Sequence, residues 1–333
     1  MTNATKTLSI VFVGTLALSL AASWRWEPAS AAFEEELLAV DTSAVQAVRI
    51  ASPERPTVRL ERADAGWTVA PADTTAAYPA STRAVNRLLS TLPSLQVGAV
   101  ATRQPRKHPR YGVDSTGTTV TMLGTEDAPL GRLIVGRTQF RTSQAGRQRR
   151  SPLQRRRRGG TPITYVRPPE QPDVYSVEHS LRTVSGRSVD DWRDKSIWAV
   201  SRADVQRIDF RYPADSAFTV RRVAPADSAA AQRAWVSAGD TLSQSEVSPA
   251  LRMLTAPRAS AFANSLSPND LGAPLYTLRL HLSSGARRTL RLFRAPGSFY
   301  RATADGYPYV AEVRRGRWDR SVLRGRSAFL QGE

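Results

Sequence analysis

The chain has 333 residues, and 41% of them are hydrophobic, which is enough to form the buried cores of two domains. Its formal net charge of +18 favours anionic polymers or anionic membrane surfaces as neighbours. The chain has no cysteine, which excludes disulfides, cysteine metal ligands, thiol nucleophiles and a lipid-modified N-terminal cysteine.

The N-terminal segment is apolar. Residues 8–22 follow a lone Lys6, and a helix of that length spans about 22 Å, or about 28 Å when it is extended through Trp24 and Trp26. Tryptophan rings suit the membrane interface. We therefore expect residues 1–26 to form a single transmembrane helix, either a retained anchor or an uncleaved signal, at the bacterial cytoplasmic (inner) membrane. The bulk of the chain would then form an extracytoplasmic, periplasmic domain.

Two alternatives remain for this segment. Its length also fits a cleaved signal peptide, with Ala29-Ser30-Ala31 as a possible cleavage site behind Pro28. A buried core helix is the other alternative, although its extreme N-terminal position and the polar stretch after it argue against this interpretation. Residues 27–44 are expected to be a linker.

After this linker, the same order of predicted strands and helices occurs twice, in residues 45–200 and in residues 201–333. Each copy opens with two strands and a tryptophan, and continues with a helix, a turn and further strands. The matching opening segments are 45–50, 58–62 and Trp67 in the first copy, and 205–210, 218–222 and Trp235 in the second. Such a long period is typical of two similar domains rather than of a solenoid.

Each copy contains one amphipathic helix. Apolar residues at i, i+3, i+4 and i+7 lie on one helix face, which predicts a helix packed against a sheet. These residues are Val85, Leu88, Leu89 and Leu92 in the first copy, and Val247, Ala250, Leu251 and Leu254 in the second.

The strands alternate apolar and polar residues. In residues 276–282, Tyr276, Leu278, Leu280 and Leu282 share one face, while polar side chains point the other way. A sheet with one buried face is typical of antiparallel pairing. The expected fold class is α+β, with two similar modules of one-sided antiparallel sheet, each packed with a helix.

An arginine-rich stretch, residues 137–162, interrupts the first copy. It has no apolar periodicity, so we expect a disordered loop. Its possible contacts to an anionic lipid or polymer surface are Arg147, Arg149, Arg150, Arg155, Arg156, Arg157 and Arg158. No nucleic-acid partner is expected, because the stretch lacks aromatic residues for base stacking.

Catalytic chemistry has little support in the sequence. The three histidines, His108, His179 and His281, have no partner at metal-ligand spacing, and no nucleophile elbow or phosphate-binding glycine loop occurs. The acidic pair Asp190-Asp191 is expected to start a short helix capped by Ser188. Trp192 would then be buried and Arg193 to Lys195 exposed. We expect no catalytic residue, no cofactor and no metal, and hence no enzyme.

The ordered series of segments resembles the DUF4340 family of uncharacterised bacterial membrane-anchored proteins. The similar segments are Val48 to Ile50, Val58 to Arg62, Gly66-Trp67, Ala84 to Leu95, Arg110 to Val113, Tyr165-Val166, Val174 to Val177 and Asp191 to Lys195. Val113 stands where leucine is usual in that family, and the arginine-rich stretch is an addition. The resemblance implies no known enzymatic activity and no catalytic residues. It implies instead an accessory of an ABC-type transport or gliding-related membrane complex.

The function expected from these observations is that of a non-enzymatic, membrane-anchored extracytoplasmic binding or scaffold protein, a transport accessory within a membrane protein complex. The alternative is a binder of anionic envelope polymer or lipid through basic faces.

Overall fold

The computed structural model describes residues 37–74, 76–141, 160–181, 186–213, 216–223 and 234–330. The chain divides into two units, Met1–Arg193 and Asp194–Glu333, which are treated separately below. Within the described ranges no helix is both long enough and apolar enough to cross a bilayer. The expected membrane segment 1–26 lies outside these ranges.

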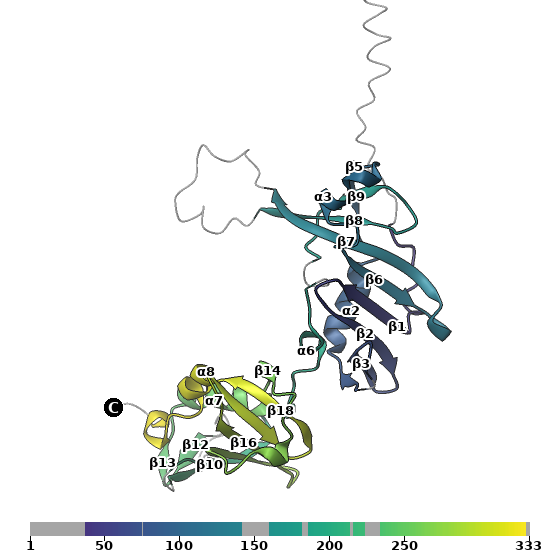
Figure 1. Ribbon diagram of the computed structural model, residues 1–333. Helices are drawn as coiled ribbons and strands as arrows, with labels where there is room; N and C mark the ends of the chain where they lie inside the picture. The colour runs from purple at the N-terminus through teal and green to yellow at the C-terminus, as the bar shows by residue number, and fades with distance from the viewer. Residues whose placement is uncertain are drawn as a thin grey trace, which may run out of the picture. The chain divides into compact units, whose positions relative to one another are not determined.

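In the part that the structure describes, the first module contains nine strands, one long helix and several short helices (Figure 1). The strands are β1 (Ala47–Ser52), β2 (Arg55–Ala63), β3 (Gly66–Pro71), β4 (Tyr78–Pro79), β5 (Val97–Thr102), β6 (Thr118–Leu123), β7 (Pro129–Arg141), β8 (Thr161–Arg167) and β9 (Val174–Val177). The helices are α2 (Thr82–Thr91), η1 (Pro105–Lys107), α3 (His108–Tyr111), η2 (Thr125–Asp127) and α6 (Val189–Trp192).

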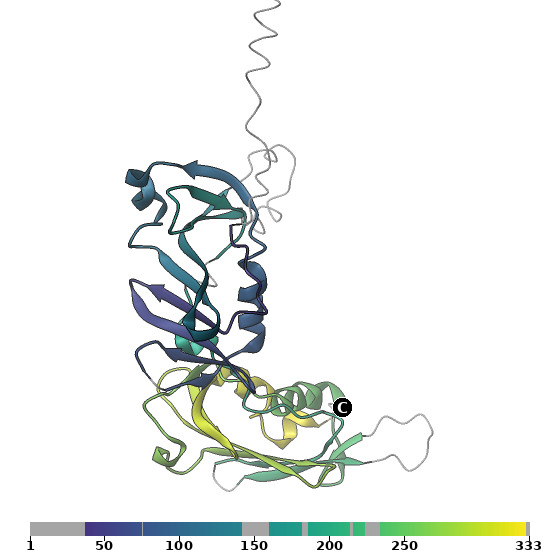
Figure 2. The ribbon, with the colours of Figure 1, turned by 90° about the vertical axis from the view of Figure 1, so that its right-hand side faces the viewer.

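These strands form one antiparallel sheet in the order β4-β3-β2-β1-β6-β7-β8-β9-β5. Helix α2 lies along one face of the sheet (Figure 2) and presents Val85, Leu88 and Leu89 to it. Burying this apolar stripe is the main stabilisation available to a helix of this length, because isolated helices so short are marginal in water. Leu92, which caps the helix, is also buried, as its spacing predicts.

The described residues of the second module form nine strands as well. They are β10 (Val205–Arg211), β11 (Ala217–Val223), β12 (Ala234–Ser237), β13 (Asp240–Thr241), β14 (Ala261–Phe262), β15 (Tyr276–Leu282), β16 (Arg287–Arg294), β17 (Phe299–Ala304) and β18 (Tyr307–Arg314). The helices are α7 (Gln244–Thr255), η3 (Pro268–Asp270), α8 (Arg315–Ser321) and η4 (Arg326–Phe329).

The order of the second sheet, β13-β12-β11-β10-β15-β16-β17-β18-β14, repeats that of the first strand for strand. The pairing register repeats too: Ile50 pairs with Val58 and Val120, and Phe210 pairs with Phe218 and Leu278. Trp67 on β3 and Trp235 on β12 take the same place in their sheets. The α+β fold with two similar antiparallel modules, predicted from the sequence, is thereby confirmed.

The inner face of the second sheet is apolar, as its alternation predicts. Leu278 and Leu280 on β15 and Leu290 and Leu292 on β16 are fully buried beneath α7 and α8. The opposite, outer face is not uniformly polar in either module. In the first, Val113, Ile134 and Val174 form a small apolar cluster there, under the segment that contains α3. The sequence predicted a sheet with one buried face, but in the first module the segment that contains α3 also covers part of the other face.

The strands and the core extend beyond the segments expected from the sequence. Strand β7 continues to Arg141 and β8 begins at Thr161, so paired strand reaches into both ends of the stretch 137–162. Leu38, within the expected linker 27–44, is buried in the first core. Phe140 shows why the strand end is hard to recognise, since it is an apolar side chain that stays 56% exposed.

The short helix α6 forms as expected, with one difference. Ser188 and Asp191 make a reciprocal capping box, and Trp192 is buried. Arg193, however, is only 2% exposed, so the expectation that it faces solvent is wrong. Its guanidinium lies 3.9 Å from the Tyr78 ring centroid and 3.1 Å from an Asp190 carboxylate oxygen. An aromatic face and a carboxylate together compensate the charge of a buried arginine.

Candidate functional site

The residues singled out in the sequence do not assemble into one site. The seven arginines between Arg147 and Arg158 lie outside the described residues. His108 donates from Nε2 to the carbonyl oxygen of Pro172 at 2.8 Å, which is a structural contact. The main-chain carbonyl of His179 accepts a hydrogen bond from the buried Thr164 hydroxyl at 2.6 Å.

His281 has a partner that the sequence analysis missed. Strands β10 and β15 are neighbours, and they bring the His281 ring to 2.7 Å from Asp209. Arg207 at 2.7 Å and Thr219 at 2.9 Å bind the same carboxylate. Burial alone raises the pKa of Asp209, but the hydrogen bonds from Arg207, His281 and Thr219 outweigh it and keep the pKa below its usual range. The cluster is an ion-pair network on the outer face of the sheet.

Among the described residues no group of three or more histidine, cysteine or carboxylate side chains is placed to hold a metal ion. The His281–Asp209 pair alone supplies two such groups. A protein zinc site needs three or four ligands, so this pair does not meet the requirement.

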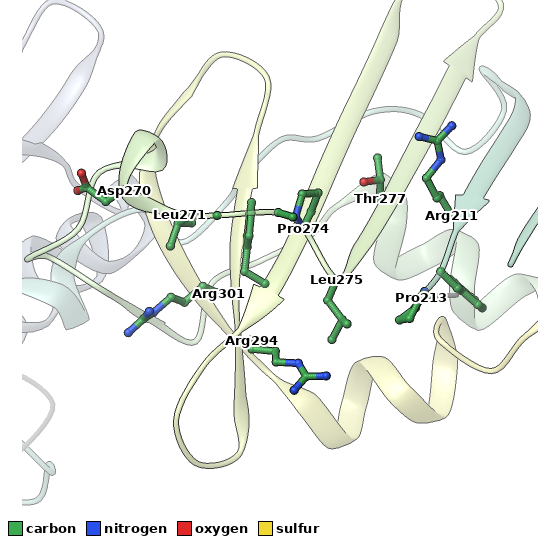
Figure 3. A pocket seen from close by; sticks show the side chains of 13 residues that line it. Arg211, Pro213, Asp270, Leu271, Pro274, Leu275, Thr277, Arg294 and Arg301 are labelled. Carbon is green, nitrogen blue, oxygen red and sulfur yellow. The ribbon is translucent and has the colours of Figure 1, made fainter. Parts of the chain in front are cut away.

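A cleft of about 740 Å³ lies at the end of strands β10, β15 and β16 of the second module (Figure 3). One wall is the loop 270–275 that leads from η3 into β15. The apolar part of the lining consists of Pro213, Leu271, Pro274, Leu275 and Phe293.

Three arginines stand around this cleft: Arg211 at the end of β10, Arg294 at the end of β16, and Arg301 on β17. None of their side chains forms an ion pair or hydrogen bond with a described residue. The Nε of Arg301 is in addition buried without a hydrogen-bond partner. A buried polar atom in this state is costly, and the Nε atoms of Arg222, Arg315, Arg324 and Arg326 are in the same state.

Among the described residues that line the cleft, Asp270 is the one carboxylate. Its carboxylate accepts a hydrogen bond from the backbone N–H of Ser267 at 2.6 Å and closes a capping box at the start of η3. Hydrogen bonds from the N–H and the hydroxyl of Ser267 lower the pKa of Asp270, so it stays ionised. The described lining of the cleft therefore carries three positive charges and one negative charge.

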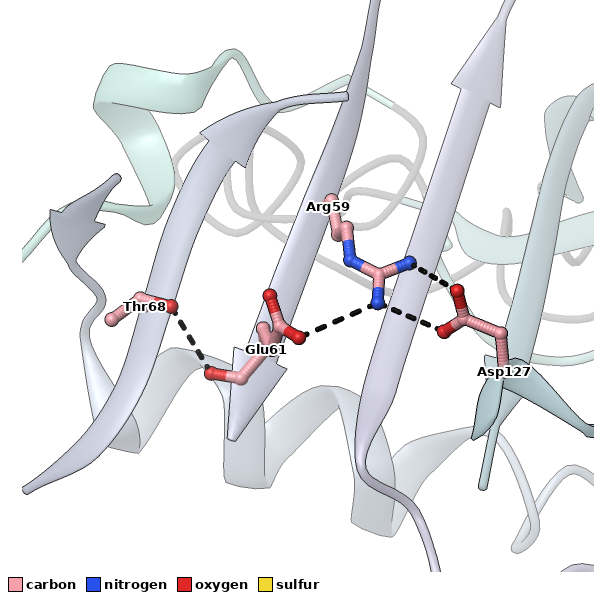
Figure 4. Close-up of polar contacts among 4 residues, drawn as sticks. All are labelled: Arg59, Glu61, Thr68 and Asp127. Atoms are coloured by element: carbon pink, nitrogen blue, oxygen red, sulfur yellow. Dashed lines mark hydrogen bonds and ion pairs between the residues drawn. The ribbon is translucent and has the colours of Figure 1, made fainter. Parts of the chain in front are cut away.

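In the first module, Arg59 on the outer face of the sheet already has carboxylate partners. Arg59 binds Asp127 at 2.8 Å and Glu61 at 3.4 Å (Figure 4). The hydrogen bond from Arg59 lowers the pKa of Asp127, and the same contact raises the pKa of Arg59. There the cation is already satisfied by the protein, whereas the three arginines of the cleft are not.

The cleft is not evident from the sequence, because Arg211, Arg294 and Arg301 belong to three strands and are scattered among many other arginines. Only the pairing of β10 with β15, and of β16 with its neighbours, places them around one hollow.

Comparison with known proteins gave one finding. The sequence model of a family described as "Domain of unknown function (DUF4340)" matches residues 72–145 and 157–277. Neither the curated proteins nor the solved structures gave a match.

Proposed function

The chain belongs to the DUF4340 family, and from this premise we propose that it is a non-enzymatic, membrane-anchored binding or scaffold protein. It would act on the extracytoplasmic side of the bacterial inner membrane as an accessory of an ABC-type transport or gliding-related complex. Residues 8–26 supply the anchor in this proposal.

The chemistry of the cleft carries the non-enzymatic part of the proposal. Its arginines can hold anionic groups, but the described residues of its lining offer no activated nucleophile or general base. The Tyr212 hydroxyl donates to the carbonyl of Val322 at 2.8 Å, and burial raises the pKa of Tyr212. A tyrosine that stays protonated and engaged does not act as a base near neutral pH. Asp270 is held by its capping box.

Native membranes provide the test of anchoring and partnership. Protease added to spheroplasts should digest the two modules, and detergent extraction after crosslinking should recover the full chain together with membrane proteins. Full protection from protease would contradict the topology. Release of a soluble, shortened chain would indicate a cleaved signal peptide in place of the anchor.

A second candidate function is binding of anionic envelope polymer or lipid. The outer face of the second sheet favours it, because Arg207 pairs across the strands with Arg221, and Arg211 and Arg279 lie nearby in a shallow hollow of the same face. Sedimentation with anionic liposomes at low and high salt tests this function, since screening weakens contacts between exposed charges. Deleting residues 144–160 tests the separate contribution of the arginine-rich stretch, at roughly 1 kcal/mol per arginine near the surface.

A further inference from the structure

Among the described residues, the basic cleft of the second module has no counterpart at the equivalent place in the first, and the strand registers show why. Val135 on β7 and Leu292 on β16 hold equivalent positions, because each pairs with the first residue of the preceding strand and with a buried residue of the following one. The paired residues are Thr118 and Val166 for Val135, and Tyr276 and Ala302 for Leu292.

The residues next along these strands are Gly136 and Phe293, and they differ in what they allow above the sheet. A Cβ atom on Gly136 would collide with the carbonyl oxygen of Tyr111 and lie 2.7 Å from Cγ1 of Val113. The segment carrying α3 therefore packs directly onto the first sheet. Phe293 is a large side chain at that position, only 8% exposed, and the corresponding loop 270–275 lies beside a cleft.

A second difference between the modules lies on the next strand, where Tyr165 of the first module is replaced by Arg301 in the second. Tyr165 pairs with Ser176 next to the Val166 pair, and Arg301 pairs with Glu312 next to the Ala302 pair, so Tyr165 and Arg301 are equivalent. The Tyr165 ring lies 4.6 Å from that of Tyr111 and packs against the apolar cluster of the first module.

At the equivalent point, the second module carries a cation with an unpartnered, buried Nε. In the first module, apolar contacts of Tyr165 fill this position. In the second module, Arg301 at the equivalent position lines the basic cleft.

We propose that this cleft binds an acidic peptide segment of a partner protein, in which carboxylate side chains alternate with apolar ones. The carboxylates would pair with Arg211, Arg294 and Arg301, and the apolar side chains would lie on Leu275 and Phe293. The proposal rests on the proposed function, and it specifies where and how the partner docks.

The arrangement favours a ligand with several separated anionic groups over a single small anion. Figure 3 shows the guanidinium groups of Arg211, Arg294 and Arg301 at separate places around the cleft. Apolar lining lies between them. A carboxylate on each reachable arginine, spaced by apolar side chains, meets both features.

The arrangement also disfavours a uniformly charged polymer. Asp270 remains ionised at one margin of the cleft and repels a chain that is negative along its whole length. A polyphosphate has no apolar groups for Leu275 and Phe293. A peptide avoids both penalties, because its backbone and apolar side chains can lie beside Asp270 while its carboxylates reach the arginines.

The test uses the purified full chain and a fluorescein-labelled octapeptide of alternating aspartate and leucine, followed by fluorescence anisotropy. Arg301→Gln and Arg211→Gln should each weaken binding about tenfold, since charge-assisted hydrogen bonds are lost. Arg83→Gln is the matched control, because it removes the same charge from the exposed face of α2 in the other module. Arg301→Tyr, which installs the residue of the first module, should weaken binding at least as much as Arg301→Gln.

The control peptide carries asparagine in place of aspartate and should not bind, and equal urea midpoints should verify that each variant is folded. Equal weakening by Arg83→Gln, or no binding of the acidic peptide by the wild-type chain, would overturn the proposal. Polyphosphate or anionic vesicles that bind at the cleft while the peptide does not would replace the peptide with another class of partner.

The same variants separate this proposal from the proposed function. If peptide binding fails while membrane proteins still co-purify with the chain, the partner docks elsewhere and the accessory function stands. If the peptide binds at the cleft and no membrane protein co-purifies, the accessory function is wrong and the peptide site stands.

Discussion

Arg222 lies over the indole of Trp235, with its guanidinium carbon 5.8 Å from the ring centroid, and the two residues face each other across β11 and β12. The first module repeats this pair as Arg62 over Trp67 at 5.0 Å, again as direct cross-strand partners. The duplication has kept both the ring and the cation that covers it.

Each of these arginines also donates a hydrogen bond to a main-chain carbonyl just before the first strand of its module. Arg62 donates to the carbonyl of Val45 at 3.2 Å, and Arg222 donates to the carbonyl of Ala203 at 3.0 Å. One side chain thus joins the tryptophan, the second strand and the entry to the first strand.

Replacing either tryptophan with alanine should destabilise its module strongly. Trp67 is 7% exposed and Trp235 is 2% exposed, so Trp67→Ala and Trp235→Ala should each cost about 3–5 kcal/mol through lost burial and the cavity left behind. Urea unfolding measures this change. Unchanged midpoints would contradict the placement of these rings in the two cores.

The arginine over the ring should be coupled to it. A double-mutant cycle with Arg222→Met and Trp235→Leu should give a coupling energy of about 0.5–2 kcal/mol, as expected for a partly desolvated cation over an indole. The methionine keeps much of the apolar stem, so that the charge is what is tested. A coupling energy of zero would reduce the contact to packing alone. The same cycle on Arg62 and Trp67 provides an internal replicate.

The network around Asp209 should make stability depend on pH in a defined direction. The pKa of Asp209 is lowered in the folded protein, so its contribution is complete above the unfolded pKa and disappears as pH falls through the folded pKa. Asp209→Asn should therefore cost about 1 kcal/mol at pH 7 and much less at pH 2–3. Urea midpoints at the two pH values measure this. A penalty that persists at low pH would mean that a lost neutral contact, and not the charge, is responsible.

The contrast between two glycines tests the packing of the outer face. Gly136→Ala should destabilise by roughly 1–3 kcal/mol, because the added methyl group meets Tyr111 and Val113. Gly272→Ala is the control, since an added Cβ there has no atom within 4 Å, and its effect should stay within about 0.5 kcal/mol. Thermal unfolding followed by circular dichroism compares the two. If Gly136→Ala changed the stability as little as Gly272→Ala does, the first module would have room for a methyl group above Gly136.

The parts of the fold that local spacing encodes were predictable from the sequence. The i, i+3, i+4, i+7 pattern located α2 and α7 with their buried residues, and the strict alternation of β15 gave its inner face. The duplication was evident because the same series of strands, tryptophan and helix occurs twice along the chain.

Contacts set by distant strand pairing were not predictable in this way. Nothing local places Asp209 beside His281, because the contact depends on β10 pairing with β15. The cleft depends on Phe293 occupying, in the second module, the position at which the α3 segment of the first module packs onto Gly136. The burial of Arg193 was missed for a similar reason, since its compensating ring, Tyr78, comes from an edge strand far away in the sequence.

The strand order of the two sheets also determines which strands lie at the edges, where another molecule could pair. Three of the four outermost strands in the described structure, β4, β13 and β14, have only two residues each. The fourth, β5, is longer, but its pairing with β9 is broken by irregularities between Val97 and Ala99 and between Val100 and Thr102. Rows of unpaired main-chain N–H and C=O groups recruit strands from other molecules and seed aggregates when they are long and flat. Among the described strands such rows are short or distorted, which leaves little straight, unpaired edge on which a strand of another molecule could pair.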